Sequence, residues 1–165
     1  MACEWFRFDR AASVVGFAAI DDRVMGGCSR SQLRHDPAGH AVFEGQVSLQ
    51  AGGGFASVRA PIGAVPDARA QGCQVELLGD GKRYKLGLRV DGDFDGLSYQ
   101  AALAPPAGVW TVLQLPWTAF EPTWRGRPVP DAPALRPEAL RQLGLLIGDR
   151  QAGPFALGLR SIILV

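Results

Sequence analysis

The chain has 165 residues and a formal net charge of +1, with 17 Lys and Arg residues against 16 Asp and Glu residues. Because nucleic acids are bound through concentrated positive charge, this balance and the lack of a basic run exclude them as favoured partners. The length predicts a single domain over residues 1–165.

The N-terminal segment, residues 1–9, alternates aromatic residues with charged ones. A signal peptide would need a basic start and a continuous apolar run, so we read a first strand here. Cys3, Cys28 and Cys73 form no CxxC pair, which predicts neither a disulfide framework nor a zinc site. Reduced cysteines and apolar runs too short to cross a bilayer favour a cytoplasmic protein without a membrane span.

Short segments with alternating apolar and polar residues follow along the whole chain. A turn at residues 35–40 separates a polar strand from residues 41–50, and Gly79-Asp80-Gly81-Lys82 predicts a hairpin between two strands. The strands expected after residue 50 are 55–60, 73–78, 83–90, 97–103, 109–115, 143–147 and 155–164.

The segment 116–137 contains six prolines together with three aromatic residues, and we interpret it as an ordered loop. Residues 137–142 predict a short helix with proline in its first turn. Eight to ten short strands and one short helix predict an all-β sandwich or barrel.

Two glycine-rich segments carry the most specific signature. Residues 22–29 read Asp-Arg-Val-Met-Gly-Gly-Cys-Ser, and residues 53–59 read Gly-Gly-Phe-Ala-Ser-Val-Arg. With Phe43-x-Gly45 between them and matching aromatic positions further on, the chain resembles the complex I intermediate-associated protein family over nearly its whole length. The resemblance implies a jelly-roll β-sandwich of the galactose-binding-domain-like type, similar to carbohydrate-binding modules.

The resemblance also suggests a function. Eukaryotic members of that family are mitochondrial chaperones that help to build the membrane arm of respiratory complex I, and many bacterial members are free-standing domains. We therefore expect a free-standing bacterial member that binds protein, acts as an assembly factor or chaperone, and needs no cofactor. The alternative is a carbohydrate- or small-ligand-binding module that uses the concave sheet face with Tyr84, Tyr99 and Arg59.

The two signatures have a functional and a structural interpretation. In the first they form a recognition surface; in the second the glycines take positive φ, Met25 fills the core, and Asp22 or Ser29 bonds to nearby backbone amides. Arg59 either grips a carboxylate of a partner or pairs with Asp21 or Asp22. The candidate binding residues are Asp22, Arg23, Gly26, Gly27, Ser29, Gly53, Gly54, Phe55, Ser57, Arg59, Tyr84, Tyr99, Trp117 and Trp124.

Other groups of residues give weaker evidence for metal binding or catalysis. Asp91, Asp93 and Asp95 match the first half of a calcium loop, but position twelve is Ala102 instead of a bidentate Glu, so an acidic hairpin turn is preferred. His35 and His40 lack further metal ligands nearby and are expected to face solvent. The sequence contains no Gly-x-Ser-x-Gly elbow, phosphate loop or HExxH motif, and predicts a protein that is not an enzyme.

Overall fold

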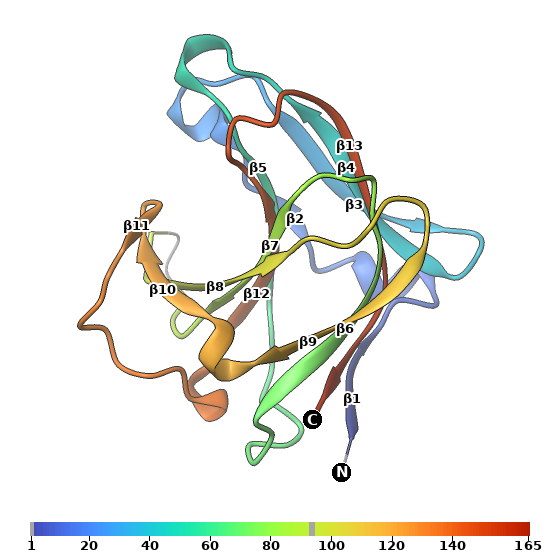
Figure 1. Ribbon diagram of the computed structural model, residues 1–165, viewed down its shortest axis with the longest axis vertical. Helices are drawn as coiled ribbons and strands as arrows, with labels where there is room; N and C mark the ends of the chain where they lie inside the picture. Colours follow the sequence, from blue (N-terminus) through green and yellow to red (C-terminus); the bar gives the residue numbers. More distant parts are fainter. Residues whose placement is uncertain (1, 93–94) are drawn as a thin grey trace.

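The computed structural model describes residues 2–92 and 95–165, and for Arg23 and Val24 it describes the backbone only. The described residues form two antiparallel sheets that face each other (Figure 1). Sheet A has six strands: β1 (Cys3–Arg7), β3 (Arg30–Asp36), β4 (His40–Val47), β6 (Gly72–Leu78), β9 (Trp110–Pro116) and β13 (Gly153–Leu164). Sheet B has seven: β2 (Ala18–Ala19), β5 (Ala56–Pro61), β7 (Tyr84–Arg89), β8 (Ser98–Leu103), β10 (Glu121–Trp124), β11 (Arg127–Pro128) and β12 (Gln142–Ile147).

The long strand β13 occupies the centre of sheet A, whose order is β3-β4-β13-β6-β9. Strand β6 runs along one side of β13, while β4 and then β1 pair along the other. The first and last strands are therefore neighbours, with Cys3 opposite Leu164, and both termini lie together at the bottom of Figure 1. Sheet B has the order β11-β10-β8-β7-β12-β5-β2.

The core lies between the two sheets and is built by the alternation of the strands. Leu86 and Leu88 of β7 and Leu143 and Leu145 of β12 are almost wholly buried, whereas the residues between them face outward. Both sheets also share an aromatic cluster. Phe43 of β4 lies 5.0 Å from Phe155 of β13 and 6.1 Å from Tyr84 of β7, measured between ring centroids.

The all-β sandwich predicted from the sequence is confirmed, but the hairpin predicted at residues 79–82 is wrong. Strands β6 and β7 belong to different sheets, so this segment crosses from sheet A to sheet B. Asp80 connects the sheets at this crossing, because its carboxylate accepts hydrogen bonds from the Tyr84 hydroxyl (2.9 Å) of sheet B and the Ala156 amide (2.9 Å) of sheet A. Residues 104–109 likewise cross from β8 in sheet B to β9 in sheet A.

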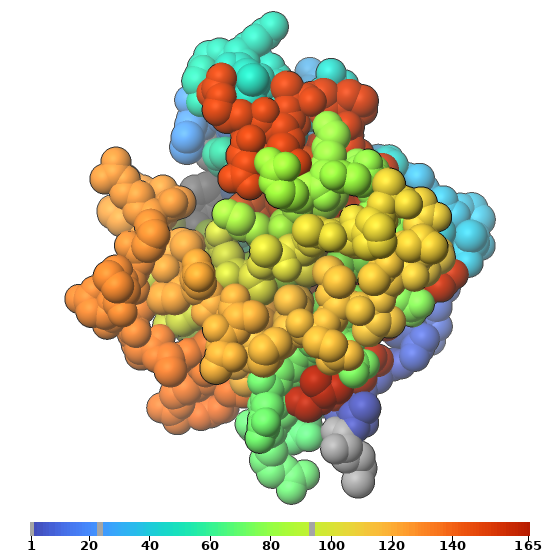
Figure 2. All heavy atoms as spheres, viewed as in Figure 1, coloured from blue at the N-terminus to red at the C-terminus, as the bar shows by residue number. Residues whose placement is uncertain are grey.

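The short elements also differ from expectation. The helix predicted over residues 137–142 is a single 3-10 turn, η5 (Pro137–Ala139), and the segment 116–137 holds another, η4 (Trp117–Ala119), as well as the β10–β11 hairpin. The remaining 3-10 turns in the described residues are η1 (Ala11–Val14), η2 (Asp22–Met25) and η3 (Gln50–Gly52). Figure 2 shows the proline-rich segment, in orange, projecting along the left margin of the molecule.

Candidate functional site

The first signature is organised around the buried carboxylate of Asp22. One oxygen, Oδ1, accepts the Ser29 amide at 2.8 Å, and the other, Oδ2, accepts the Ser29 hydroxyl at 2.5 Å. Oδ2 also accepts the amides of Gly54 (2.7 Å) and Phe55 (3.3 Å) in the second signature. Burial raises the pKa of this carboxyl, but the hydrogen bonds outweigh the burial and hold the pKa below its ordinary value. Asp22 therefore joins the two signatures as an ionised acceptor.

The neighbouring Asp21 extends this network to the sheets. Its carboxylate accepts the hydroxyl (2.5 Å) and the amide (3.1 Å) of Ser31 on β3, and the amide of Ser57 (3.0 Å) on β5. The Ser57 hydroxyl donates in turn to the Ile20 carbonyl. Strand β5 is thus fixed in position by both acids.

Two glycines of the signatures make room for the Asp22 carboxylate. A Cβ atom on Gly27 would lie 2.5 Å from Cγ of Asp22, and one on Gly53 would lie 2.5 Å from its Oδ2. Gly26 has a different role, since its positive φ of 87° suits glycine at a turn. Met25 was expected in the core but is 67% exposed, because the 3-10 turn η2 presents it to solvent. The predicted binding residue Arg23 has a side chain outside the described part of the structure.

The outer face of sheet B carries a shallow hollow of about 50 Å³. In one row across the sheet, Gln100, Gly87, Gly144 and Arg59 are successive neighbours on β8, β7, β12 and β5. The next row that faces outward contains Ser98, Arg89 and Gln142. Because the two glycines have no side chains, the floor of the hollow is backbone, and its walls combine polar side chains with Leu146. We call this feature the glycine-floored hollow.

Two arginines lie in the wall of this hollow and are half-buried. Burial, and secondly repulsion from Arg89, lower the pKa of Arg59 to about 10. Burial also lowers the pKa of Arg89, whereas Asp91 and Asp95 oppose that shift. Both guanidinium groups remain positively charged at neutral pH, so the hollow presents two cations on one side of the sheet.

The aromatic residues predicted for the concave sheet face do not lie there. Tyr84 and Tyr99 are each 2% exposed and point into the core, and their hydroxyls donate to Asp80 and to the Pro133 carbonyl (2.6 Å). The alternation within β7 and β8 places both rings on the inner side. Among the described residues that line the hollow, none is aromatic.

The two tryptophans predicted to contact a partner differ in their surroundings. Trp117 is half-buried: it donates from Nε1 to the Ala70 carbonyl at 2.7 Å and packs on Phe120, which indicates an anchoring role. Trp124 is 45% exposed, and its Nε1 donates to the Asp95 carbonyl at 3.1 Å. Trp110 lies on the outer side of sheet A, where the Arg160 guanidinium stacks 3.9 Å from the ring centroid.

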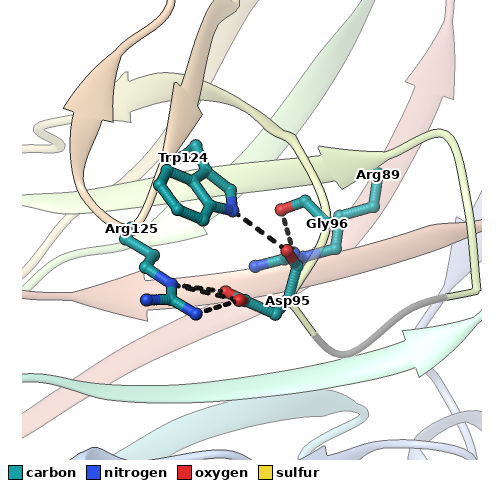
Figure 3. Close-up of polar contacts among 5 residues, drawn as sticks. All are labelled: Arg89, Asp95, Gly96, Trp124 and Arg125. Atoms are coloured by element: carbon teal, nitrogen blue, oxygen red, sulfur yellow. Dashed lines mark hydrogen bonds and ion pairs between the residues drawn. The ribbon is translucent and has the colours of Figure 1, made fainter.

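The acidic turn between β7 and β8 is held by the β10–β11 hairpin, as Figure 3 shows. Arg125 pairs with the Asp95 carboxylate at 2.5 Å, and Arg89 donates to the Gly96 carbonyl at 2.7 Å. Asp95 is therefore engaged by a cation. Asp93, part of the less favoured calcium hypothesis, lies outside the described residues, and among the residues that are described no cluster of His, Cys, Asp and Glu could hold a metal ion.

The histidines are not simple solvent-facing turn residues. His40 packs edge-on against Trp110, with ring centroids 5.0 Å apart, and Nε2 of His35 is buried without a hydrogen-bond partner.

The cysteines are free in the structure, and Cys28 is exposed. Within the described ranges, no helix has the length and apolar character that crossing a membrane requires.

Comparison with known proteins assigns the family. The sequence profile of the complex I intermediate-associated protein 30 family matches residues 6–159. The chain belongs to this family. Its match starts within β1 and ends within β13, so the family's sequence pattern spans both sheets and includes the two signatures joined by Asp22.

Relatives and solved structures agree with this assignment. This chain is 29% identical over 169 residues to the "Uncharacterized protein C9E9.15" of Schizosaccharomyces pombe. The match covers 88% of this chain and 76% of that protein. The fold of this chain is similar to that of a family 11 carbohydrate-binding module of Clostridium thermocellum, solved in complex with a β-1,3-1,4-mixed-linked tetrasaccharide. The TM-score is 0.68 at 13% identity, and the match covers 99% of this chain and 95% of the module. The family 11 carbohydrate-binding module of the cellulosomal cellulase Lic26A-Cel5E of Clostridium thermocellum gives a TM-score of 0.70 at 12% identity, covering 100% of this chain and 94% of the module. The jelly-roll fold predicted from the sequence is thus confirmed.

The structure brings together some of the predicted binding residues and separates others. Arg59 and Ser57 line the glycine-floored hollow. The signature residues Asp22, Ser29, Gly53 and Gly54 form a buried network at the start of β5 instead. Among the described residues no ion pair joins Arg59 to Asp21 or Asp22, because both acids accept from serine and backbone donors. Sequence reasoning missed Gly87, Arg89 and Gly144, which meet only through the strand register.

Proposed function

We propose that this family member is a non-catalytic binding domain that acts as an assembly factor, and that it holds a client protein on the outer face of sheet B. The observation that carries the proposal is the glycine-floored hollow, whose walls present Arg59, Arg89, Gln100 and Gln142. Arginine is enriched at protein interfaces and at the residues that contribute most of their binding energy.

The signatures have a supporting role in this proposal. Asp21 fixes the amide of Ser57, and Asp22 fixes the amides of Gly54 and Phe55, at the start of the strand that carries Arg59. Asp22 and the glycines around it therefore affect binding indirectly, because they set the position of β5. The family name points to an intermediate of respiratory complex I as the client, and we extend that role to this chain as part of the proposal.

Site-specific photo-crosslinking tests the proposal. A benzoylphenylalanine at Ala102, which is exposed on the same face of sheet B, should form adducts with subunits of a multi-subunit complex in a host extract. The same residue at Val112, 51% exposed on sheet A, serves as the control and should not. Identical adducts from both positions, or none from Ala102, would overturn the assignment of this face.

A second candidate function is glycan binding, which the likeness to carbohydrate-binding modules favours. The polar side chains of the hollow can bond to hydroxyl groups, but its described lining offers no aromatic ring for a sugar to stack on. Titration with the mixed-linked tetrasaccharide, read by isothermal calorimetry, separates the two functions. Heat of binding that is lost in Arg59→Ala would favour the glycan, and silence would leave the client protein as the ligand.

A further inference from the structure

The glycine-floored hollow has the size of a small charged group. A cavity needs about 10–15 Å³ in this measure to hold one water molecule. The hollow, at about 50 Å³, therefore accommodates a group of three or four heavy atoms, such as a carboxylate. A pocket that encloses a drug-sized ligand has about 300 Å³ or more.

The two glycines of the floor are not equivalent. A Cβ atom on Gly144 would lie 2.6 Å from the Val58 carbonyl oxygen, so the sheet itself requires glycine there. A Cβ atom on Gly87 would meet only the Ser98 hydroxyl oxygen at 3.5 Å and the Gly144 carbonyl oxygen at 4.0 Å. The fold therefore does not require glycine at position 87, and its absent side chain leaves space open to a ligand.

The charges around this space favour an anion. Arg59 and Arg89 lie on opposite sides of β12, because β5 and β7 pair with its two edges; their register partners in β12 are Gly144 and Gln142. Lys85 lies on the same outward side of β7, two residues from Gly87. Among the described acids, Asp91 and Asp95 act on Arg89, and Glu121 on β10 is the register partner of Gln100. Arg125 engages Asp95.

We propose that the glycine-floored hollow is a carboxylate-binding site that receives an Asp or Glu side chain from an extended segment of the client protein. The inference rests on the proposed function and names the chemistry of the client. The carboxylate would lie over Gly87 between the two guanidinium groups, which can form charge-assisted hydrogen bonds. The Gln100 and Gln142 side chains flank the position where the peptide backbone of the client would run.

An NMR titration tests the site directly. The ligand is a hexapeptide of alternating Glu and Ser, and its counterpart with Gln in place of Glu is the neutral control. We expect the acidic peptide to shift the amide signals of Gly87 and Gly144 and to bind more weakly at high salt, whereas the neutral peptide leaves these signals unchanged. Equal shifts with both peptides, or shifts confined to other surfaces, would overturn the proposal.

Variants of the wall and floor sharpen the test. Gly87→Val fills the hollow, and Arg89→Gln removes a cation; each should weaken binding of the acidic peptide about tenfold or more. Gly63→Val is the matched control, because a Cβ atom there meets nothing within 4 Å, and it should bind as the wild type does. Full affinity in both Gly87→Val and Arg89→Gln would refute the site, and Arg89→Gln decides the matter alone if the valine variant fails to fold.

Two further measurements distinguish the carboxylate site from the proposed protein-binding function. Trigalacturonic acid offers carboxylates on a sugar, and binding as tight as that of the peptide would contradict a peptide source. Crosslinks from Ala102 to a client, together with no response to the acidic peptide, would retain the protein-binding function and reject only the carboxylate site.

Discussion

At the scale of single residues, Asp22 joins the two glycine-rich signatures. Its buried carboxylate accepts hydrogen bonds from Ser29, Gly54 and Phe55. Asp22→Ala would leave these donors buried without an acceptor, so we expect the free energy of unfolding to fall by about 3 kcal/mol. Urea denaturation measures the change. Asp131→Ala, at an exposed acid, should stay within about 0.5 kcal/mol of the wild type, and a similar small loss in Asp22→Ala would contradict the network.

The depressed pKa of Asp22 predicts a pH dependence. The folded-state pKa lies below 3.8, the ordinary value, so ionised Asp22 stabilises the fold above about pH 3.8. This contribution is lost as the pH falls through the folded pKa. The urea midpoint of the wild type should drop more steeply between pH 5 and pH 2 than that of Asp22→Asn, which cannot ionise at this position. Parallel curves would show that Asp22 does not titrate in this way.

The close approach of Gly53 to Asp22 gives a separate prediction. A Cβ atom at position 53 would also lie 2.9 Å from the Ser48 carbonyl oxygen, so Gly53→Ala should destabilise the protein by about 2 kcal/mol. Chemical denaturation of Gly63→Ala, where the added methyl group meets open space, provides the reference. Equal stability of the two variants would mean that the signature glycine is not required by packing.

At the scale of elements, the β10–β11 hairpin is fastened to the turn before β8. Asp95→Ala removes the ion pair with Arg125 while leaving the backbone oxygen that accepts the Trp124 indole N–H. We expect an unchanged urea midpoint, because exposed ion pairs contribute little, but faster hydrogen exchange at Nε1 of Trp124. Glu138→Ala, which breaks the exposed pair with Arg136 elsewhere, is the control. Unchanged exchange in Asp95→Ala would show that the ion pair does not hold the hairpin.

Strand positions could be predicted from the sequence, but strand partners could not. Alternation placed strands at residues 73–78 and 83–90, close to β6 and β7, yet the turn chemistry at residues 79–82 suits a crossing between sheets as well as a hairpin. The buried side of Tyr84 and Tyr99 could not be predicted for a similar reason. Alternation along a strand divides its residues between two faces, but it does not show which face is buried. Gly87 and Gly144 meet through strand register, and no local signal in the sequence links them.

At the scale of the whole molecule, Asp80 connects the two sheets through Tyr84 and Ala156. Tyr84→Phe removes one of these hydrogen bonds and should cost about 1 kcal/mol of unfolding free energy. In a double-mutant cycle with Asp80→Ala, the two losses should sum to about 1 kcal/mol more than the loss in the double variant, because both single changes remove the same bond. Strict additivity would show that the hydroxyl and the carboxylate do not interact.

The position of β13 at the centre of sheet A governs when this fold can form during synthesis. Strands β4, β6 and β1 all pair with β13, which is the last strand of the sheet to leave the ribosome. Until then β4 and β6 expose edges that would recruit foreign strands. The nascent chain therefore needs protection from aggregation, and a translation arrest before Gly153 should leave sheet A without its centre and open to proteolysis.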